Sequence, residues 1–229
     1  MGLIINIDTA IDTTCISIAK DGEIIAVSSN SAQKDHGGFL QPAIKALLRN
    51  ISLSIRDLDA VAISAGPGSY TGLRVGMASA KGICYALNKP LITIGTLEIL
   101  AFAAILEANK ETISPGSMFC PLIDARRMEV FTAIYNQQLE TVLSPCAMIL
   151  DENSFANRLL KNKILFVGNG AKKWELICKH ENAKFITVFS NALAMSRLSF
   201  KKYEYDDFAD LAYSEPLYLK EFPGSQTQN

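Results

Sequence analysis

The amino-acid sequence of 229 residues predicts an α/β protein made of two similar lobes. Strand and helix patterns alternate after an opening run of strands, which is typical of this class. Residues 121–125 repeat the pattern of residues 5–9, an apolar strand that ends in Asp and a small residue, and an alternating strand follows each copy at 129–135 and 13–20. The repetition predicts a duplicated unit, in which a β-meander is continued by α/β units.

Composition and charge exclude several classes of protein. Hydrophobic residues make up 49% of the chain, which excludes a disordered chain and suffices for a core in each lobe. The 22 Lys and Arg residues against 23 Asp and Glu give a net charge of −1, so the surface as a whole has no electrostatic attraction for nucleic acid. Any role on RNA must be local or carried by a partner.

Cysteine spacing and hydropathy indicate the cellular compartment in which the protein is expected. The five cysteines are odd in number and widely spaced, with no C-x-x-C, which favours buried thiols in a reducing environment over disulfides or zinc. The chain opens without a secretory signal pattern, and its longest apolar stretch, 91–106, falls short of the ~20 residues that a bilayer span needs. We therefore expect a cytoplasmic protein without a membrane segment.

Turn and capping residues define the elements of the first half. Asp21-Gly22 is a hairpin dipeptide, Pro42 lies near the first turn of an amphipathic helix, Pro90 ends a second helix, and Thr96 is the expected N-cap of a third. The expected order is strands at 3–8, 13–20 and 23–29, a helix from 39 to 48, a strand at 59–65, a helix at 73–87, a strand at 91–94 and a helix at 96–108.

The second half is expected to repeat this plan less regularly. We assign the first lobe to 1–108 and the second to 109–222, with the option that the last helix packs back on the first lobe. The Gly/Ser/Gln/Asn-rich tail at 223–229 is expected to be disordered. The expected elements are strands at 121–125 and 129–135, a helix at 152–160, a strand at 164–167, a turn at 168–170, and then helix–strand–helix material.

A glycine-rich loop at 66–72, with the sequence G-P-G-S-Y-T-G, follows a predicted strand and opens a predicted helix. Backbone N–H groups and the positive helix end can hold a phosphate at such a place. The loop is no Walker A motif, since no Gly-Lys-Ser/Thr ends it, and no G-x-G-x-x-G, since Thr71 replaces the third glycine. A tight β–α turn that needs glycine conformations explains it equally well.

Asp8 and Asp124 end the two equivalent strands and could hold a Mg²⁺–nucleotide in a cleft, because carboxylates are the usual ligands of that ion. Each could instead cap a turn by accepting a hydrogen bond from the backbone two residues on, and we slightly favour this interpretation. The candidate residues of a weak nucleotide site are Asp8, Thr9, Gly66, Gly68, Ser69 and Asp124.

The sequence offers little for metal or hydrolytic chemistry. His36 and His180 are the only histidines and lie far apart, so no H-x-x-x-H or H-E-x-x-H pair exists. Ser69 is not in a G-x-S-x-G elbow, and neither histidine stands in an obvious triad context. We expect neither a metal site nor a hydrolytic nucleophile.

The helix after the glycine loop repeats small residues every four positions, at Gly72, Gly76 and Ala80, which places them on one face. Each interior glycine costs about 1 kcal/mol of helix stability relative to alanine, so something approaches this backbone closely. With that face against the sheet, we expect the positions between to serve a partner. The interface candidates are His36, Phe39, Leu40, Ala43, Leu47, Tyr70, Leu73, Arg74, Met77, Ala78 and Lys81.

Several motifs together resemble the bacterial TsaB (YeaZ) family over nearly the whole chain. The most specific is the run 65–76, which contains G-P-G-S-Y-T-G-L-R. Residues 138–191 are the least recognisable part, and Lys220 replaces the more familiar arginine. The other matching segments are I-D-T-A at 7–10, C-I-S-I at 15–18, His36 with L-Q-P at 40–42, G-T-L-E at 95–98, I-D-A-R at 123–126, E-V-F at 129–131 and P-L-Y-L-K at 216–220.

The resemblance implies the ASKHA fold of actin, sugar kinases and Hsp70, and a role in making N6-threonylcarbamoyladenosine at position 37 of tRNA. It implies a non-catalytic subunit that supports the metal-bearing TsaD, joined by the ATPase TsaE. The corresponding helix at 96–108 has no histidine, in contrast to the H-x-x-x-H helix of the catalytic relatives. We expect a homodimer when the chain is alone, tRNA contact through the complex, no cofactor required by this chain, and ATP/ADP–Mg at the complex.

Two other functions remain as alternatives. An active ASKHA-type ATP-dependent phosphotransferase or ATPase would use Asp8, the loop 66–72 and Asp124. A glycopeptidase is the weaker alternative, because the sequence lacks metal ligands.

Overall fold

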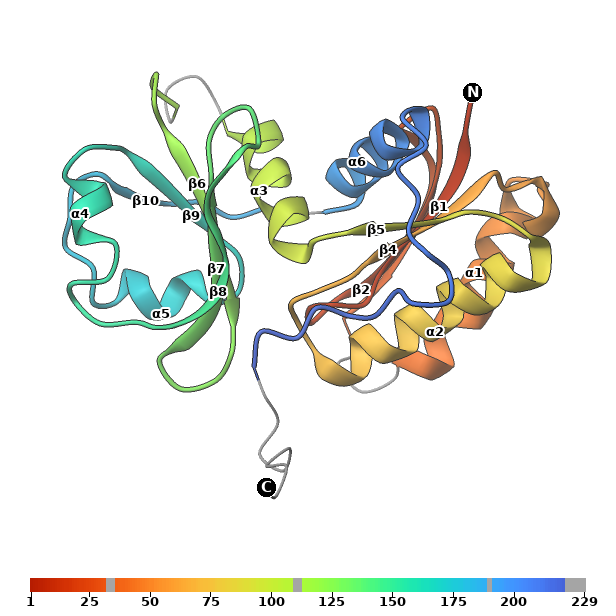
Figure 1. Ribbon diagram of the computed structural model, residues 1–229, viewed down its shortest axis with the longest axis horizontal. Helices are drawn as coiled ribbons and strands as arrows, with labels where there is room; N and C mark the ends of the chain where they lie inside the picture. Colours follow the sequence, from red (N-terminus) through yellow and green to blue (C-terminus); the bar gives the residue numbers. More distant parts are fainter. Residues whose placement is uncertain (32–35, 109–112, 189–190, 221–229) are drawn as a thin grey trace.

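The structure is a computed structural model that describes residues 1–31, 36–108, 113–188 and 191–220. Figure 1 shows two lobes side by side, each built on a five-stranded mixed sheet with helices on its faces. The predicted α/β class is confirmed, and so is the duplication, because the two sheets have equivalent strand orders. The expected tail at 223–229 lies outside the described residues.

The first sheet has the order β3-β2-β1-β4-β5. Its first three strands form an antiparallel meander, and β4 and β5 continue it in parallel with β1. The hairpin between β2 and β3 turns at Asp21 and Gly22, both with positive φ, as the dipeptide predicts. The strands are β1 (Leu3–Asp8), β2 (Thr14–Lys20), β3 (Glu23–Asn30), β4 (Ala60–Ser64) and β5 (Leu91–Ile94).

Helices cover both faces of this sheet. On one face, α1 (His36–Asn50) and α2 (Tyr70–Leu87) pack on the isoleucines of β1 and β2, with the short 3₁₀ helix η1 (Ile55–Asp57) before β4. The other face packs against α3 (Thr96–Glu107) and α6 (Ala192–Glu204). The first lobe is therefore completed by a helix near the end of the chain.

The second sheet, in the order β10-β9-β6-β7-β8, repeats the first. Its inner face packs on α3, which lies between the two sheets, and its outer face carries an aromatic core around Trp174. Trp174 lies 4.5 Å from Phe166 and 5.2 Å from Phe155, centroid to centroid. The elements are β6 (Met118–Asp124), β7 (Glu129–Tyr135), β8 (Thr141–Ile149), α4 (Ala156–Leu159), β9 (Ile164–Val167), α5 (Ala171–Glu175) and β10 (Ala183–Phe185).

Two segments of the second lobe differ from the sequence prediction. The third meander strand, β8, was not predicted, because it carries Pro145 and does not alternate cleanly between apolar and polar residues. The helix expected at 152–160 shortens to α4, since a turn at 152–155 with Phe155 at φ 62° precedes it. Both differences lie in the least recognisable part of the chain.

After α6 the chain crosses the first lobe again as an irregular segment, the C-terminal strap (residues 205–220). Ala209 bridges to Leu91 at the free edge of β5, and the Leu217 amide donates to the Ala65 carbonyl over 2.7 Å. Figure 1 shows the strap passing over α2 and then reaching the second lobe. The strap therefore touches both lobes.

Helix α2 lies unusually close to the turn between β1 and β2. A Cβ at Gly72 would lie 2.0 Å from the Thr9 carbonyl oxygen, and one at Gly76 would lie 2.2 Å from Thr9 Oγ1. The Thr9 hydroxyl, fully buried, donates to the Gly72 carbonyl over 2.8 Å. The small residues thus face this chain's own sheet, where they allow a backbone contact that no larger side chain would permit.

We predict that Gly76→Ala destabilises the protein by about 1–3 kcal/mol, because the added methyl overpacks against Thr9 and Ile63. The matched control is Gly82→Ala on the same helix, where an added Cβ meets nothing within 4 Å. It should stabilise the protein by about 1 kcal/mol through helix propensity alone. Urea unfolding of both variants measures the difference, and equal effects would contradict the close contact.

Candidate functional site

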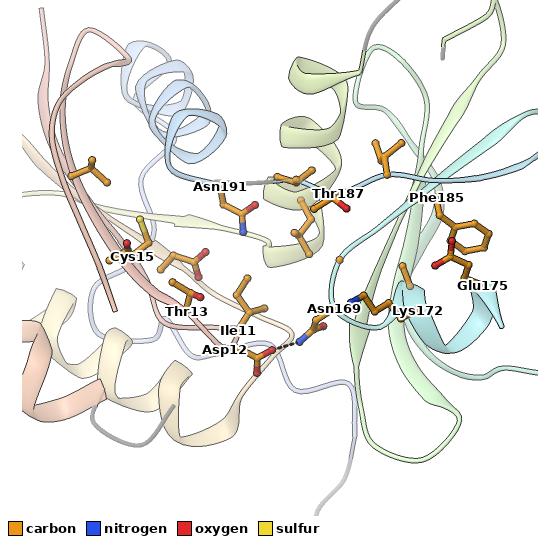
Figure 2. A pocket seen from close by; sticks show the side chains of 18 residues that line it. Ile11, Asp12, Thr13, Cys15, Asn169, Lys172, Glu175, Phe185, Thr187 and Asn191 are labelled. Carbon is orange, nitrogen blue, oxygen red and sulfur yellow. Dashed lines mark hydrogen bonds between the residues drawn. The ribbon is translucent and has the colours of Figure 1, made fainter. Parts of the chain in front are cut away.

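A cleft of about 760 Å³ opens between the two lobes (Figure 2). The first lobe contributes the turn after β1, and the second contributes the turn after β9, α5 and the segment after β10. Three carboxylates and one lysine carry its charge: Asp8, Asp12, Glu175 and Lys172. Its other lining side chains include Ile11, Cys15, Leu100, Phe185, Thr187 and Asn191.

Asp8 lines this cleft and is only 3% exposed. Burial raises the pKa of its carboxyl above the ordinary value, although interactions with Ser64, Asn191 and the Ala10 amide oppose the shift. The Ala10 amide donates to Asp8 Oδ1 over 3.1 Å, which is the turn cap that the sequence favoured. Burial and the Asp8 charge also raise the pKa of the Cys15 thiol to about 12, so this thiol is not a nucleophile at neutral pH.

Asp124, at the equivalent place in the second lobe, also caps its turn. It accepts the Arg126 amide over 2.6 Å and the Lys173 ammonium over 2.7 Å. Although partial burial raises the pKa of this carboxyl, its hydrogen bonds to Lys173 and the Arg126 amide lower it below the ordinary value overall. Asp124 is not among the residues that line the cleft.

Asn169 joins the two lobes at the mouth of the cleft, a role that the sequence did not predict. Its Nδ2 donates to Asp12 Oδ2 of the first lobe over 2.9 Å, as Figure 2 shows, and its Oδ1 accepts the Asp124 amide over 2.9 Å. The G-N-G turn at 168–170 was the available signal, because Asn between glycines is free to present its amide at a tight turn.

The glycine loop supports the first lobe and does not line the cleft. A Cβ at Gly68 would lie 2.1 Å from the Ala10 carbonyl oxygen, and one at Gly66 would lie 2.7 Å from the Leu217 carbonyl oxygen. Ser69 caps α2 by accepting the Gly72 amide over 3.3 Å. The loop therefore fits the tight-turn interpretation, and its glycines face protein backbone.

The structure does not gather the nucleotide candidates into one site. The candidate set is divided, because Asp8 faces the cleft while Gly66, Gly68, Ser69 and Asp124 do not line it. The charged groups that do line it are mostly carboxylates, which repel phosphate. No group of three or more His, Cys, Asp or Glu side chains that could hold a metal occurs within the described ranges.

The interface candidates divide by burial. Leu40, Ala43, Leu47, Leu73 and Met77 belong to the first lobe's own core. The expectation that Met77 faces a partner is wrong: its side chain is 4% exposed, because it shares the sheet-facing side of α2 with Gly76 and Ala80. Phe39 packs partly against the same core, and the side chain of His36 lies outside the described part.

The remaining candidates lie on or beside the outer surface of α2. Lys81 donates to the carbonyls of Ala212 and Ser214 in the strap over 3.1 and 3.0 Å. Arg74 stacks on Tyr70, with 4.1 Å from Cζ to the ring centroid, and donates to the Tyr218 hydroxyl over 3.2 Å. The strap therefore covers the Arg74–Lys81 side of α2, while Ala78 stays exposed.

Between α1 and the strap, α2 exposes a surface that includes only one of the interface candidates, Ala78. Its exposed positions follow helical spacing, and the neighbouring α1 adds an exposed row. Tyr85 is 84% exposed, and a Cβ at Gly82 would meet nothing within 4 Å. We call this surface the outer helix face; its residues are Pro42, Lys45, Ala46 and Arg49 of α1 with Thr71, Ala78, Gly82 and Tyr85 of α2.

Comparison with known proteins gives the family. The family model described as TsaD, tRNA N6-adenosine threonylcarbamoyltransferase, matches residues 23–216. The Bacillus subtilis protein named tRNA threonylcarbamoyladenosine biosynthesis protein TsaB is 31% identical over 172 residues, which are 72% of this chain and 70% of that protein. The chain belongs to the TsaB family. The resemblance carried by the G-P-G-S-Y-T-G run and its companion motifs is confirmed.

Comparison of this TsaB-family chain with solved structures identifies its fold. YeaZ from Pseudomonas aeruginosa matches with a TM-score of 0.75 and 22% identity over 96% of this chain and 100% of that chain. An inorganic polyphosphate/ATP-glucomannokinase from Arthrobacter matches with a TM-score of 0.51 and 10% identity over 90% of this chain and 100% of that chain. With the duplicated sheets, these likenesses confirm the ASKHA fold. Across the described ranges, every helix is too short or too polar to cross a membrane.

We predict that Asp8→Asn raises the free energy of unfolding at neutral pH. A carboxyl whose folded-state pKa is raised stabilises the fold below its unfolded pKa and loses that contribution as the pH rises through the folded-state value. The amide keeps an acceptor for the Ala10 N–H and avoids the buried charge. Unfolding from pH 4 to 8 should show a gap that widens with pH; a wild type that is more stable at pH 8 would contradict this.

Proposed function

We propose that this chain is a non-catalytic subunit of the tRNA N6-threonylcarbamoyladenosine synthesis complex, where it binds and supports a TsaD-type catalytic subunit. The observation that carries the proposal is membership of the TsaB family together with a free outer helix face on the first lobe. The names of the relatives indicate the pathway, and the exposed surface offers a site at which this chain could bind a partner protein.

The outer helix face has the composition and shape of a protein interface. Small residues at Ala46, Ala78 and Gly82 let another helix approach closely, and Tyr85 is an exposed aromatic anchor of the kind enriched at interfaces. Lys45 and Arg49 form a polar rim on the α1 side. A partner of related fold could lay two helices across these two, and a second copy of this chain could occupy the same face when that partner is absent.

The cleft supports a role without chemistry of its own. Its acidic lining and the backbone-filled glycine loop disfavour nucleotide phosphates, and the Cys15 thiol is held protonated. We therefore expect the chain alone to bind Mg²⁺–ATP no more tightly than millimolar. A thermal shift with Mg²⁺–ATP should leave the Tm unchanged; a rise that Asp8→Ala abolishes would instead support the phosphotransferase alternative.

The deciding experiment is reconstitution. The purified chain is mixed with the TsaD-type subunit of the same organism, and co-elution and tRNA threonylcarbamoylation are measured with a TsaE-type ATPase present. Modification should require this chain and should be absent when the chain acts alone. Full modification without it would overturn the proposal.

We predict that Gly82→Glu weakens association with the catalytic subunit on the order of 100-fold, because it buries an unpaired charge in the interface. The fold should be retained, since Gly82 is exposed and has open space around it. Leu160→Glu, at a 73% exposed position of the second lobe, is the control and should bind normally. Met77→Glu is unsuitable because it places a charge in the core, and unchanged binding by folded Gly82→Glu would place the interface elsewhere.

A further inference from the structure

The turn between β6 and β7 places two arginines in a conformation that their side chains do not favour. Arg126 has φ 72° and Arg127 has φ 48°, and both are exposed. A left-handed conformation costs an ordinary L-residue roughly 1–2 kcal/mol, which is why Asn and Gly usually occupy such turns. Two adjacent arginines here indicate that the guanidinium groups, and not the turn, account for the choice of residue.

The surroundings of this turn leave its positive charge uncompensated. The neighbouring carboxylates are already paired, Asp124 with Lys173 and Glu129 with Lys220. Among the described residues, the side chains of Arg126 and Arg127 contact no carboxylate. The turn therefore presents two guanidiniums to solvent, each with a fork of donors that matches phosphate oxygens.

The C-terminal strap connects this turn to a third arginine, Arg74 of α2. Lys220 contacts Glu129, whose amide donates to the Arg126 carbonyl over 3.0 Å. Tyr218 precedes Lys220 by two residues, which is roughly 7 Å along an extended chain. Its hydroxyl accepts a hydrogen bond from Arg74 Nε. The ring of Tyr70 supports the other side of the Arg74 guanidinium, so this group is exposed yet held in one orientation.

We infer that Arg74, Arg126 and Arg127 form a contact surface for the phosphate backbone of RNA, which we call the arginine surface. The inference rests on the proposed function, because the tRNA brought to the complex is the polyanion available to it. The arginine surface joins the start of α2 to the second lobe and borders the outer helix face, because Arg74 lies one helical turn before Ala78. A chain of net charge −1 can thus contribute local attraction for RNA without binding it tightly alone.

An acidic protein is a less suitable occupant than RNA. Guanidiniums that project from a turn of one lobe and from helix α2 of the other suit phosphates repeated along a backbone. A protein partner on this surface is one of the outcomes that the test separates.

The test variant is Arg126→Asn with Arg127→Gly, which places at both positions residues that adopt positive φ readily. Its Tm should equal or exceed that of the wild type, because the left-handed strain is relieved. Each variant is assembled with the TsaD-type subunit, co-elution is checked first, and binding of labelled tRNA is measured by anisotropy at several KCl concentrations. Lys161→Gln with Lys179→Gln removes the same charge from exposed positions elsewhere on the second lobe and is the control.

We expect the turn variant to form the complex normally and to bind tRNA roughly tenfold more weakly near physiological salt. The slope of log K against log salt should fall by about 1.4–1.8, as the loss of two phosphate contacts requires, while the control keeps the wild-type slope. An unchanged affinity and slope would overturn the inference. So would a turn variant that no longer assembles, since the arginines would then contact protein. Failure of the wild type to assemble is seen before RNA is added and would overturn the proposed function itself.

Discussion

The architecture of the first lobe depends on the contact between α2 and the turn after β1. Gly68, Gly72 and Gly76 bring the loop and the helix against the backbone of Thr9 and Ala10, and the buried Thr9 hydroxyl binds the Gly72 carbonyl. This contact fixes the rotation of α2 about its axis. It therefore decides which residues enter the core and which form the outer helix face on the opposite side.

The two lobes share a strand order but differ in the helices that cover their sheets. In the first, two long helices leave an exposed face; in the second, α4 and α5 are short and enclose an aromatic core around Trp174. Helix α3 packs between the sheets, and Asn169 and the strap also connect the lobes. These contacts hold the relative position of the lobes, which suits the proposed role of a subunit that presents fixed surfaces to its partners.

Sequence patterns predicted most of the fold because periodicity and turn chemistry are local. The strands β1, β7 and β9 fall where apolar runs and alternation place them, the β2–β3 turn falls at Asp21-Gly22, and α2 ends before Pro90. Met77 was misassigned because the buried side of α2 is wider than the stripe of small residues and also includes Leu73 and Met77, which the spacing of the small residues alone does not show. The bridge at Asn169 and the burial of Asp8 depend on residues far apart in the chain, so a local pattern such as the G-N-G turn can mark a tight turn but not the contact that it makes.

The return of α6 to the first sheet has a consequence for biosynthesis. The face of that sheet formed by Ile4, Ala62 and Ile92 is covered by α3 and, only after the whole second lobe has been made, by α6. On the ribosome, the lobe that is translated first is therefore the last to be completed, against the usual order in which domains fold as they emerge. Until α6 arrives, the nascent chain carries a partly covered apolar sheet face that needs shielding, and a product that stops short of α6 leaves the rest of this face permanently open.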